Sequence, residues 1–215
     1  MTYGDPAWAF SRLWLQPLTK LFTRARMYGS ERIPAGGCVL AVNHLHWVDI
    51  CVVGAMSPRT IQYVAKSEVF GIPIVGWYVS LHGAIGIRRG ESDREAVRRM
   101  REAAHDGRMV GLFVEGTRQR SGRPGTAQPG AAMVALQEDV PVVPAAVYGT
   151  QFWKPGNLAP CSVAVGEPVR FEGLPKGGRG YREATAEIER RINVLFDWLA
   201  GVHARGRPRG ERPPL

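Results

Sequence analysis

Short apolar runs alternate with helical patterns along most of this 215-residue chain, and this alternation constrains its fold more than any other feature. Apolar runs that are bounded by turn residues indicate strands, and longer segments with a period near 3.6 residues indicate helices. The expected strands are residues 38–43, 61–65, 84–87, 109–114, 141–147 and 162–166, and the expected helices are 47–56, 91–105, 128–138 and 180–203. Such alternation predicts an α/β fold, in which helices flank a mixed, largely parallel sheet.

One domain accounts for most of the chain, and we place it at residues 30–204. With 45% hydrophobic residues, a chain of this length can bury one substantial core. Residues 205–215 are rich in Arg, Pro and Gly, which predicts a disordered basic tail. The cysteines at positions 38, 51 and 161 lack Cys-x-x-Cys spacing. Cys38 and Cys51 stand in apolar stretches and are expected to be buried thiols, and the set as a whole favours a reducing compartment over a disulfide framework.

Residues 1–29 form an N-terminal amphipathic helical element in this prediction. Its apolar residues are Trp8, Phe10, Leu13, Trp14, Leu15, Leu18, Leu21 and Phe22, and its basic residues are Arg12, Lys20, Arg24 and Arg26. Helical spacing gathers most of the apolar set on one side, and Pro17 should kink or split the helix. We expect this element to lie on an anionic membrane surface. The alternative is an ordinary helix that packs on the core.

The net charge of +9 predicts an anionic partner. It arises from 28 Lys and Arg against 19 Asp and Glu, and nearly all of the basic residues are arginines, which bind phosphate bidentately. Charge alone does not separate nucleic acid, a membrane surface and a phosphorylated substrate. No uncharged apolar run reaches the length of about 18 residues that a transmembrane helix needs, and Asp5 and Arg12 interrupt any signal-peptide pattern. We expect a cytoplasmic protein, peripheral on the inner face of the cell membrane.

A histidine and an aspartate stand five residues apart at the end of the first apolar strand. They are His44 and Asp49, and Asn43 precedes them. If His44 lies in the turn and Asp49 in the first helical turn, the two side chains can meet. A neutral imidazole accepts a hydroxyl proton near pH 7, and a carboxylate on its other nitrogen fixes the tautomer and stabilises the imidazolium. No serine accompanies the pair, which suggests that the attacking hydroxyl belongs to the substrate.

Two later strands also end in polar residues. Arg88 follows one of them, and Glu115 and Arg118 follow the other. Open α/β sheets bind ligands at such strand ends. The two arginines can converge on one phosphate there, while Glu115 holds an arginine or a substrate hydroxyl. The plainer interpretation is solvated arginines and a local ion pair within a turn.

Taken in order, these clusters resemble the glycerolipid acyltransferases typified by 1-acylglycerol-3-phosphate acyltransferase. The His-x-x-x-x-Asp block of that family, with its preceding asparagine, matches Asn43, His44 and Asp49. The later blocks match at Gly83 to Arg88, at Phe113, Glu115, Gly116, Thr117 and Arg118, and at Val140 to Pro144; Lys66 to Glu68 is similar to a Lys-x-Glu stretch between the first two blocks. The resemblance spans about residues 30 to 170, and the ordered set is far more specific than any single block.

The sequence departs from the family pattern in three places. Val114 stands where proline is usual, and Gln119 stands where serine is common. Gln128 and Pro129 replace basic residues that often precede the next helix. The last departure leaves open an acceptor other than the usual phosphorylated one.

The resemblance implies transfer of a fatty acyl group from an acyl-CoA or acyl carrier protein thioester to a lysophospholipid hydroxyl, above all that of 1-acylglycerol-3-phosphate. His44 then acts as the general base and Asp49 orients it, with no acyl-enzyme intermediate. The substrate-binding set carried over from the family is Asn43, Arg88, Glu115, Gly116, Thr117 and Arg118. No cofactor is implied, because the thioester is a co-substrate. The apolar stretch 69–81 either lines an acyl channel or belongs to the core.

Other interpretations remain open at this point. One is an acyltransferase of the same fold that acts on another lysophospholipid or an aminolipid. Another is a non-enzymatic basic protein that binds membranes or nucleic acid, although no nucleic-acid-binding motif supports the latter and we expect no nucleic acid partner. His44, His46 and Asp49 resemble a metal cluster, but the other histidines lack a ligand-like context, so we expect no metal.

Overall fold

The computed structural model describes residues 9–73, 75–87 and 94–215, and the strands of this part form one sheet. The strand order is β1-β7-β6-β2-β5-β3-β4. The strands are β1 (Arg26–Tyr28), β2 (Cys38–Val42), β3 (Ile61–Lys66), β4 (Ile85–Ile87), β5 (Met109–Phe113), β6 (Val142–Tyr148) and β7 (Ser162–Val165). Every neighbouring pair is parallel except β6 and β7, which are antiparallel. The predicted single α/β domain with a mixed, largely parallel sheet is confirmed.

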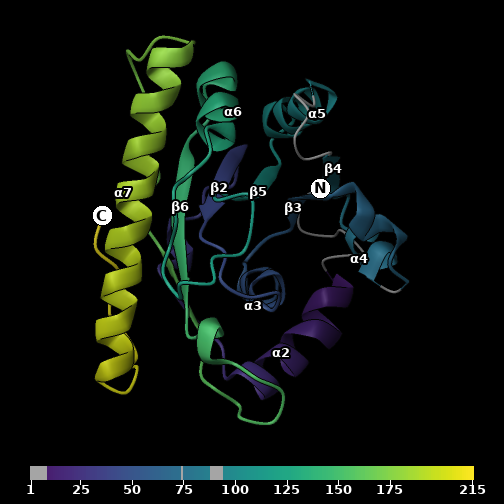
Figure 1. The fold of residues 1–215 in the computed structure, drawn as a ribbon, viewed down its shortest axis with the longest axis vertical. Helices are drawn as coiled ribbons and strands as arrows, with labels where there is room; N and C mark the ends of the chain where they lie inside the picture. The colour runs from purple at the N-terminus through teal and green to yellow at the C-terminus, as the bar shows by residue number, and fades with distance from the viewer. Residues whose placement is uncertain (1–8, 74, 88–93) are drawn as a thin grey trace.

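Helices cover both faces of this sheet (Figure 1). They are α2 (Gln16–Thr23), α3 (Asp49–Met56), α4 (Val75–Leu81), α5 (Arg94–His105), α6 (Gly130–Glu138) and α7 (Gly178–Ala204). Short helical turns add η1 (Ser11–Leu15), η2 (Ser30–Arg32), η3 (Ser67–Gly71) and η4 (Thr150–Phe152). Alternate residues of β2 point to opposite faces, so Val39 and Ala41 pack with α5, α6 and α7, whereas Leu40 and Val42 pack with α3.

Strand β2 occupies the centre of the sheet, and all of its residues are buried. This position explains its unbroken apolar sequence, because a strand covered on both faces has no polar side. Val42 is paired with Phe113 of β5 and with Ala145 of β6. The residues that follow β2 and β5 therefore emerge side by side at one edge of the sheet.

The sequence missed two elements, β1 and α4, for different reasons. Strand β1 has three residues, too few to display a period, and it forms by pairing with β7 at the sheet edge. Helix α4 lies inside the apolar stretch 69–81, where periodicity does not distinguish helix from strand. The first three residues of the predicted helix 91–105 lie outside the described residues.

Pro17 does not break the N-terminal helical element. It lies in the first turn of α2, directly after the π-helical turn η1, so the helix continues but changes its hydrogen-bonding pattern next to the proline. Trp8 lies outside the described residues. Among the helices that are described, none combines the length and apolar character needed to cross a bilayer.

Residues 205–215 differ from the disordered tail that their composition predicts. Arg207 is 7% exposed, and its guanidinium donates to the carbonyls of Arg24 (2.6 Å) and Cys161 (3.2 Å). Arg32 in turn donates to the carbonyl of Pro213 at 2.8 Å. Composition describes the average polarity of a segment, but it does not reveal carbonyl groups elsewhere in the fold that its arginines can bind.

Candidate active site

The structure brings the predicted His–Asp pair together where β2 meets α3. His44 follows the strand and Asp49 begins the helix, and His44 Nδ1 lies 2.8 Å from Asp49 Oδ2. The histidine side chain is 12% exposed, whereas the aspartate side chain is 0% exposed. A carboxylate accepts only, so Nδ1 carries the proton in the neutral ring and Nε2 carries the lone pair. This arrangement can abstract a proton from a hydroxyl group.

Asp49 is held by the backbone of the turn that it closes. Its Oδ2 atom also accepts the N–H groups of Leu45 and His46, each at 2.7 Å. Within the described part of the chain, the buried Oδ1 atom has no hydrogen-bond partner. The two backbone bonds explain the five-residue spacing, because the intervening turn folds around one carboxylate oxygen.

One aromatic ring stacks on the imidazole of His44, and a second ring packs against the first. The ring of Phe113, the last residue of β5, stacks on that of His44 with centroids 4.2 Å apart and planes at 25°. The ring of Tyr63 of β3 lies parallel to that of Phe113, with a centroid separation of 5.9 Å and planes at 3°. Stacking from neighbouring strands limits rotation of the imidazole about its Cβ–Cγ bond.

Asn43, which we expected in the substrate-binding set, is fully buried instead. Its amide nitrogen donates to the carbonyl of Val147 at 3.1 Å, and its oxygen accepts the Val147 N–H at 2.8 Å. The side chain therefore extends the pairing of β2 with β6 beyond the last strand residue. Its position supports a part in placing His44 and gives no support to contact with a substrate.

Glu115 also differs from its expected role of holding an arginine or a substrate hydroxyl. Its side chain is buried, and Oε2 accepts the backbone N–H of His44 at 2.6 Å while Oε1 accepts that of Gly125 at 3.1 Å. The N–H of Gln119 donates to the His44 carbonyl at 2.8 Å. The segment after β5 thus clamps both backbone polar groups of His44.

Burial raises the pKa of Glu115 to about 7. The N–H groups of Gly125, His44 and Glu115 itself favour the charged carboxylate and act against this shift, whereas the charge of Asp49 adds to it. Desolvation is the larger effect because these backbone donors do not replace the water that an exposed carboxylate binds. The group therefore titrates near neutral pH.

The remaining predicted residues lie on the turn after Glu115. Gly116 has a φ angle of +67°, which favours glycine, and its N–H donates to Phe113 O at 3.0 Å. Thr117 and Arg118 are exposed. Burial lowers the pKa of His46, Asp49 opposes that shift, and Arg118 adds to it, which places the Arg118 charge near the site. Arg88 lies outside the described residues.

Sequence reasoning missed Trp153, which completes an aromatic rim at the site. Trp47 and Trp153 make an edge-to-face contact at 5.6 Å, and the His46 ring lies 5.8 Å from that of Trp153. Trp47 is exposed in the structure, and its place between His44 and Asp49 in the sequence was a signal that it lies at the site. Trp153 is about 100 residues further along the sequence, and no neighbouring residue links it to Trp47. No group of three or more metal-ligating side chains gathers in the ranges that the structure describes.

Comparison with known proteins gives consistent matches. The family model described as "Acyltransferase" matches residues 24–148. Over 194 residues the chain is 28% identical to "1-acyl-sn-glycerol-3-phosphate acyltransferase" of Bacillus subtilis (strain 168), covering 86% of this chain and 94% of that protein. It is 31% identical over 144 residues to the chloroplastic protein of that name from Brassica napus, covering 65% of this chain. The match spans 42% of the plant protein, less than half of its length.

A solved structure resembles this one across nearly the whole chain. It is the 1-acyl-sn-glycerophosphate (LPA) acyltransferase PlsC from Thermotoga maritima, with a TM-score of 0.70 and 24% sequence identity. The match covers 95% of this chain and 81% of that chain. At this identity the likeness concerns the fold.

Substitution of Glu115 by glutamine should change how stability depends on pH. Because its pKa is raised in the folded state, the stability that wild type gains from protonated Glu115 is complete below about pH 4.5 and is lost as pH rises through about 7. Relative to Glu115→Gln, wild type should therefore lose on the order of 3 kcal/mol of unfolding free energy over this interval. Urea titrations of both proteins from about pH 4.5 to pH 8 measure the difference. Other titrating groups are common to both proteins and cancel, so parallel curves would contradict the assignment.

Proposed function

This chain belongs to the acyltransferase family, and from that premise we propose that it transfers a fatty acyl group from an acyl thioester to the hydroxyl of 1-acylglycerol-3-phosphate. The observation that carries the proposal is the pair of His44 and Asp49, 2.8 Å apart at the edge where β2 and β5 end. The ring nitrogen that faces away from Asp49 has its lone pair available, so a substrate hydroxyl can supply the nucleophile.

In the proposed reaction, His44 Nε2 removes the proton of the acceptor hydroxyl as its oxygen attacks the thioester carbonyl. The tetrahedral intermediate collapses with formation of the ester C–O bond and cleavage of the C–S bond. The imidazolium then returns the proton to the departing thiolate. Asp49 stabilises the imidazolium while it exists, as the aspartate of a Ser-His-Asp triad does.

An acyl-enzyme on cysteine has little chemical support. Burial raises the pKa of Cys38 to about 11 and that of Cys161 to about 12, and it also raises the pKa of Cys51. The thiolate is the nucleophilic form, so these thiols are weak nucleophiles at neutral pH. Direct transfer to the acceptor is the simpler proposal.

We assign the phosphate of the acceptor to Arg118. It lies between Glu115 and Gln119 in the segment that clamps His44, and its exposed guanidinium is close enough to His46 to lower the pKa of that residue. An arginine suits a phosphate because its planar donors bind two oxygens together. Arg88, Gly116 and Thr117 remain proposed members of this site by resemblance.

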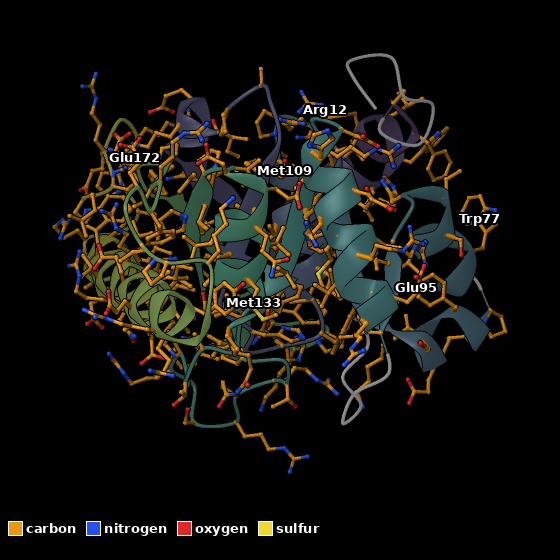
Figure 2. All side chains as sticks on the ribbon, turned by 90° about the horizontal axis from the view of Figure 1, so that it is seen from above. Arg12, Trp77, Glu95, Met109, Met133 and Glu172 are labelled. Atoms are coloured by element: carbon orange, nitrogen blue, oxygen red, sulfur yellow. The ribbon has the colours of Figure 1, made fainter. Side chains whose placement is uncertain are left out.

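The described residues support a membrane-facing surface, which we place on η1, α2, α4 and adjoining turns. Its exposed large apolar side chains are Phe10, Leu13, Trp14, Leu18, Leu21, Phe22, Trp47, Ile72, Trp77 and Phe152. The Phe10 and Trp77 rings are in edge-to-face contact at 6.0 Å, and Trp77 projects at the periphery of the molecule (Figure 2). Trp153 Nε1 donates to the Phe22 carbonyl at 2.9 Å, which joins α2 to the aromatic rim.

The orientation of α2 favours the membrane over the alternative of a core-packed helix. Leu18 and Leu21 are 51% and 64% exposed, whereas Thr19 and Thr23 are 6% and 1% exposed. A helix that served the core would bury its leucines. An anionic leaflet such as the cytoplasmic face of the cell membrane suits both this surface and the net charge of +9.

Replacement of His44 by alanine should lower acyl transfer by at least about 100-fold, because it removes the general base. Radiolabelled product should be measured with acyl-CoA and, separately, with an acyl carrier protein thioester. The acceptors are lysophosphatidate, lysophosphatidylcholine, monoacylglycerol and an acylated amino-acid lipid. His105→Ala serves as the control, because that histidine is exposed at the end of α5. Turnover by the His44 variant at the wild-type rate would remove the proposed base.

Replacement of Arg118 by alanine should raise the KM for lysophosphatidate about tenfold or more and leave kcat little changed. A charge-assisted contact contributes roughly 1.5–3 kcal/mol, and about 1.4 kcal/mol corresponds to a tenfold change in affinity. Initial rates at varied acceptor concentration measure it. Arg120→Ala is the matched control, since Arg120 is also exposed in the same loop. Equal KM values for wild type and the Arg118 variant would take this residue out of the phosphate site.

A glutamate at Leu13, which is 67% exposed on η1, should weaken binding to phosphatidylglycerol vesicles about tenfold or more. It removes an apolar contact worth roughly 1.5–3 kcal/mol and adds a repelled charge. Ala186→Glu adds the same charge to an exposed position on α7 and should bind nearly as wild type. Vesicle co-sedimentation distinguishes the two, and equal binding by both variants would contradict the proposed face.

A further inference from the structure

The loop between Gln119 and Gln128 is fastened to α7 at two points. Glu189 Oε2 accepts the backbone N–H of Ala127 at 2.7 Å. Eight residues along the helix, Asp197 Oδ1 accepts a bond of 2.7 Å from the guanidinium of Arg123, which also lies over the Phe196 ring at 5.4 Å. Eight helical residues span about 12 Å, and four extended residues span about 13 Å. The loop segment 123–127 therefore runs antiparallel to the helix, with both of its ends held.

The residue between these two anchors reaches the candidate active site. Gly125 donates its N–H to Glu115 Oε1 at 3.1 Å, and Glu115 Oε2 accepts the N–H of His44 at 2.6 Å. A hydrogen-bonded path thus leads from α7 through the loop and one buried carboxylate to the backbone of the proposed base. The link between α7 and His44 joins residues more than 140 positions apart in sequence.

We propose that Glu189 is a positioning residue for His44: it fixes Ala127, so that the neighbouring Gly125 N–H stays on the Glu115 carboxylate, which in turn holds the His44 backbone. The expected effect on kcat rests on the proposed function, whereas the expected effect on the position of His44 does not. Without the loop anchor, the buried Glu115 carboxylate loses the Gly125 N–H, one of its backbone donors, which is a costly state for a desolvated charge. Glu115 then moves toward other donors, and His44 moves with it.

The second anchor is the weaker of the two. Arg123 and Asp197 side chains are 60% and 59% exposed, and exposed ion pairs contribute little to stability. Glu189 accepts a hydrogen bond from a half-buried backbone N–H. Water reaches this N–H less easily than it reaches the Arg123–Asp197 pair, so the loss of the bond is harder to compensate. Glu189 is therefore the residue on which positioning should depend most.

Two nearly isosteric substitutions separate the acceptor oxygen from the volume of the side chain. Glu189→Met removes every acceptor oxygen, whereas Glu189→Gln keeps one for the Ala127 N–H. In the lysophosphatidate assay, the methionine variant should lose roughly 10- to 100-fold in kcat, with KM for both substrates within about twofold of wild type. The glutamine variant should retain kcat within about threefold of wild type. Glu183→Ala, an exposed position on the same helix, should match wild type.

Amide hydrogen exchange of the full-length proteins tests the positioning without any substrate. Peptides that contain Gly125 and His44 should exchange faster in Glu189→Met than in wild type, whereas those of Glu189→Gln should match wild type. If wild type acylates no lipid acceptor, the proposed function fails. Amide exchange then still tests whether Glu189 positions His44.

Three results would overturn the inference. One is wild-type kcat in Glu189→Met, and another is unchanged exchange at both peptides in that variant. The third is a glutamine variant as impaired as the methionine one, which would show that the acceptor oxygen does not matter. If Glu189→Met does not unfold cooperatively, Glu189→Ala, which also removes both acceptor oxygens, replaces it. Faster exchange of the Gly125 peptide then supports loop anchoring by Glu189, and unchanged exchange opposes it.

Discussion

One oxygen atom organises the candidate site: Asp49 Oδ2 accepts the N–H groups of Leu45 and His46 as well as the Nδ1–H of the His44 ring. The carboxylate is fully buried, so each lost donor would leave a desolvated charge less compensated. The same three contacts shape the turn from β2 to α3 and select the tautomer of the ring. Local folding and the orientation of the proposed base therefore depend on one carboxylate, so a substitution that removes this carboxylate should disturb both.

Two carboxylates converge on His44 and divide the work between ring and backbone. Asp49 holds the imidazole, whereas Glu115 holds the backbone N–H of the same residue from the end of β5. This division requires the parallel register of β2 and β5, in which Val42 pairs with Phe113 and the following residues meet at one edge. The two carboxylates also repel each other, and the charge of Asp49 contributes to the raised pKa of Glu115. Backbone N–H donors, rather than basic side chains, offset that repulsion.

The sequence predicted the elements of the core well because short apolar strands and amphipathic helices carry their own period. It also predicted that His44 and Asp49 meet, since both lie within one turn. It did not predict the partners of Asn43 or Glu115, which are backbone groups of Val147 and Gly125. A side chain that binds backbone leaves no complementary residue type to find in the sequence. The same reason explains the ordered segment after α7, where Arg207 binds carbonyl groups.

The orientation of α2 places the proposed lipid-facing surface next to the proposed reaction site. Because α2 turns its threonines inward and its leucines outward, its apolar surface is available to lipid rather than to the core. The bond from Trp153 to the Phe22 carbonyl fixes that surface to the aromatic rim, and the rim contacts His46, two residues from His44. Tryptophans settle at the headgroup level of a bilayer. On the proposed function, an acceptor lipid whose chain stays in the membrane would present its free hydroxyl at the depth where His44 lies, so that the acceptor need not leave the membrane to be acylated.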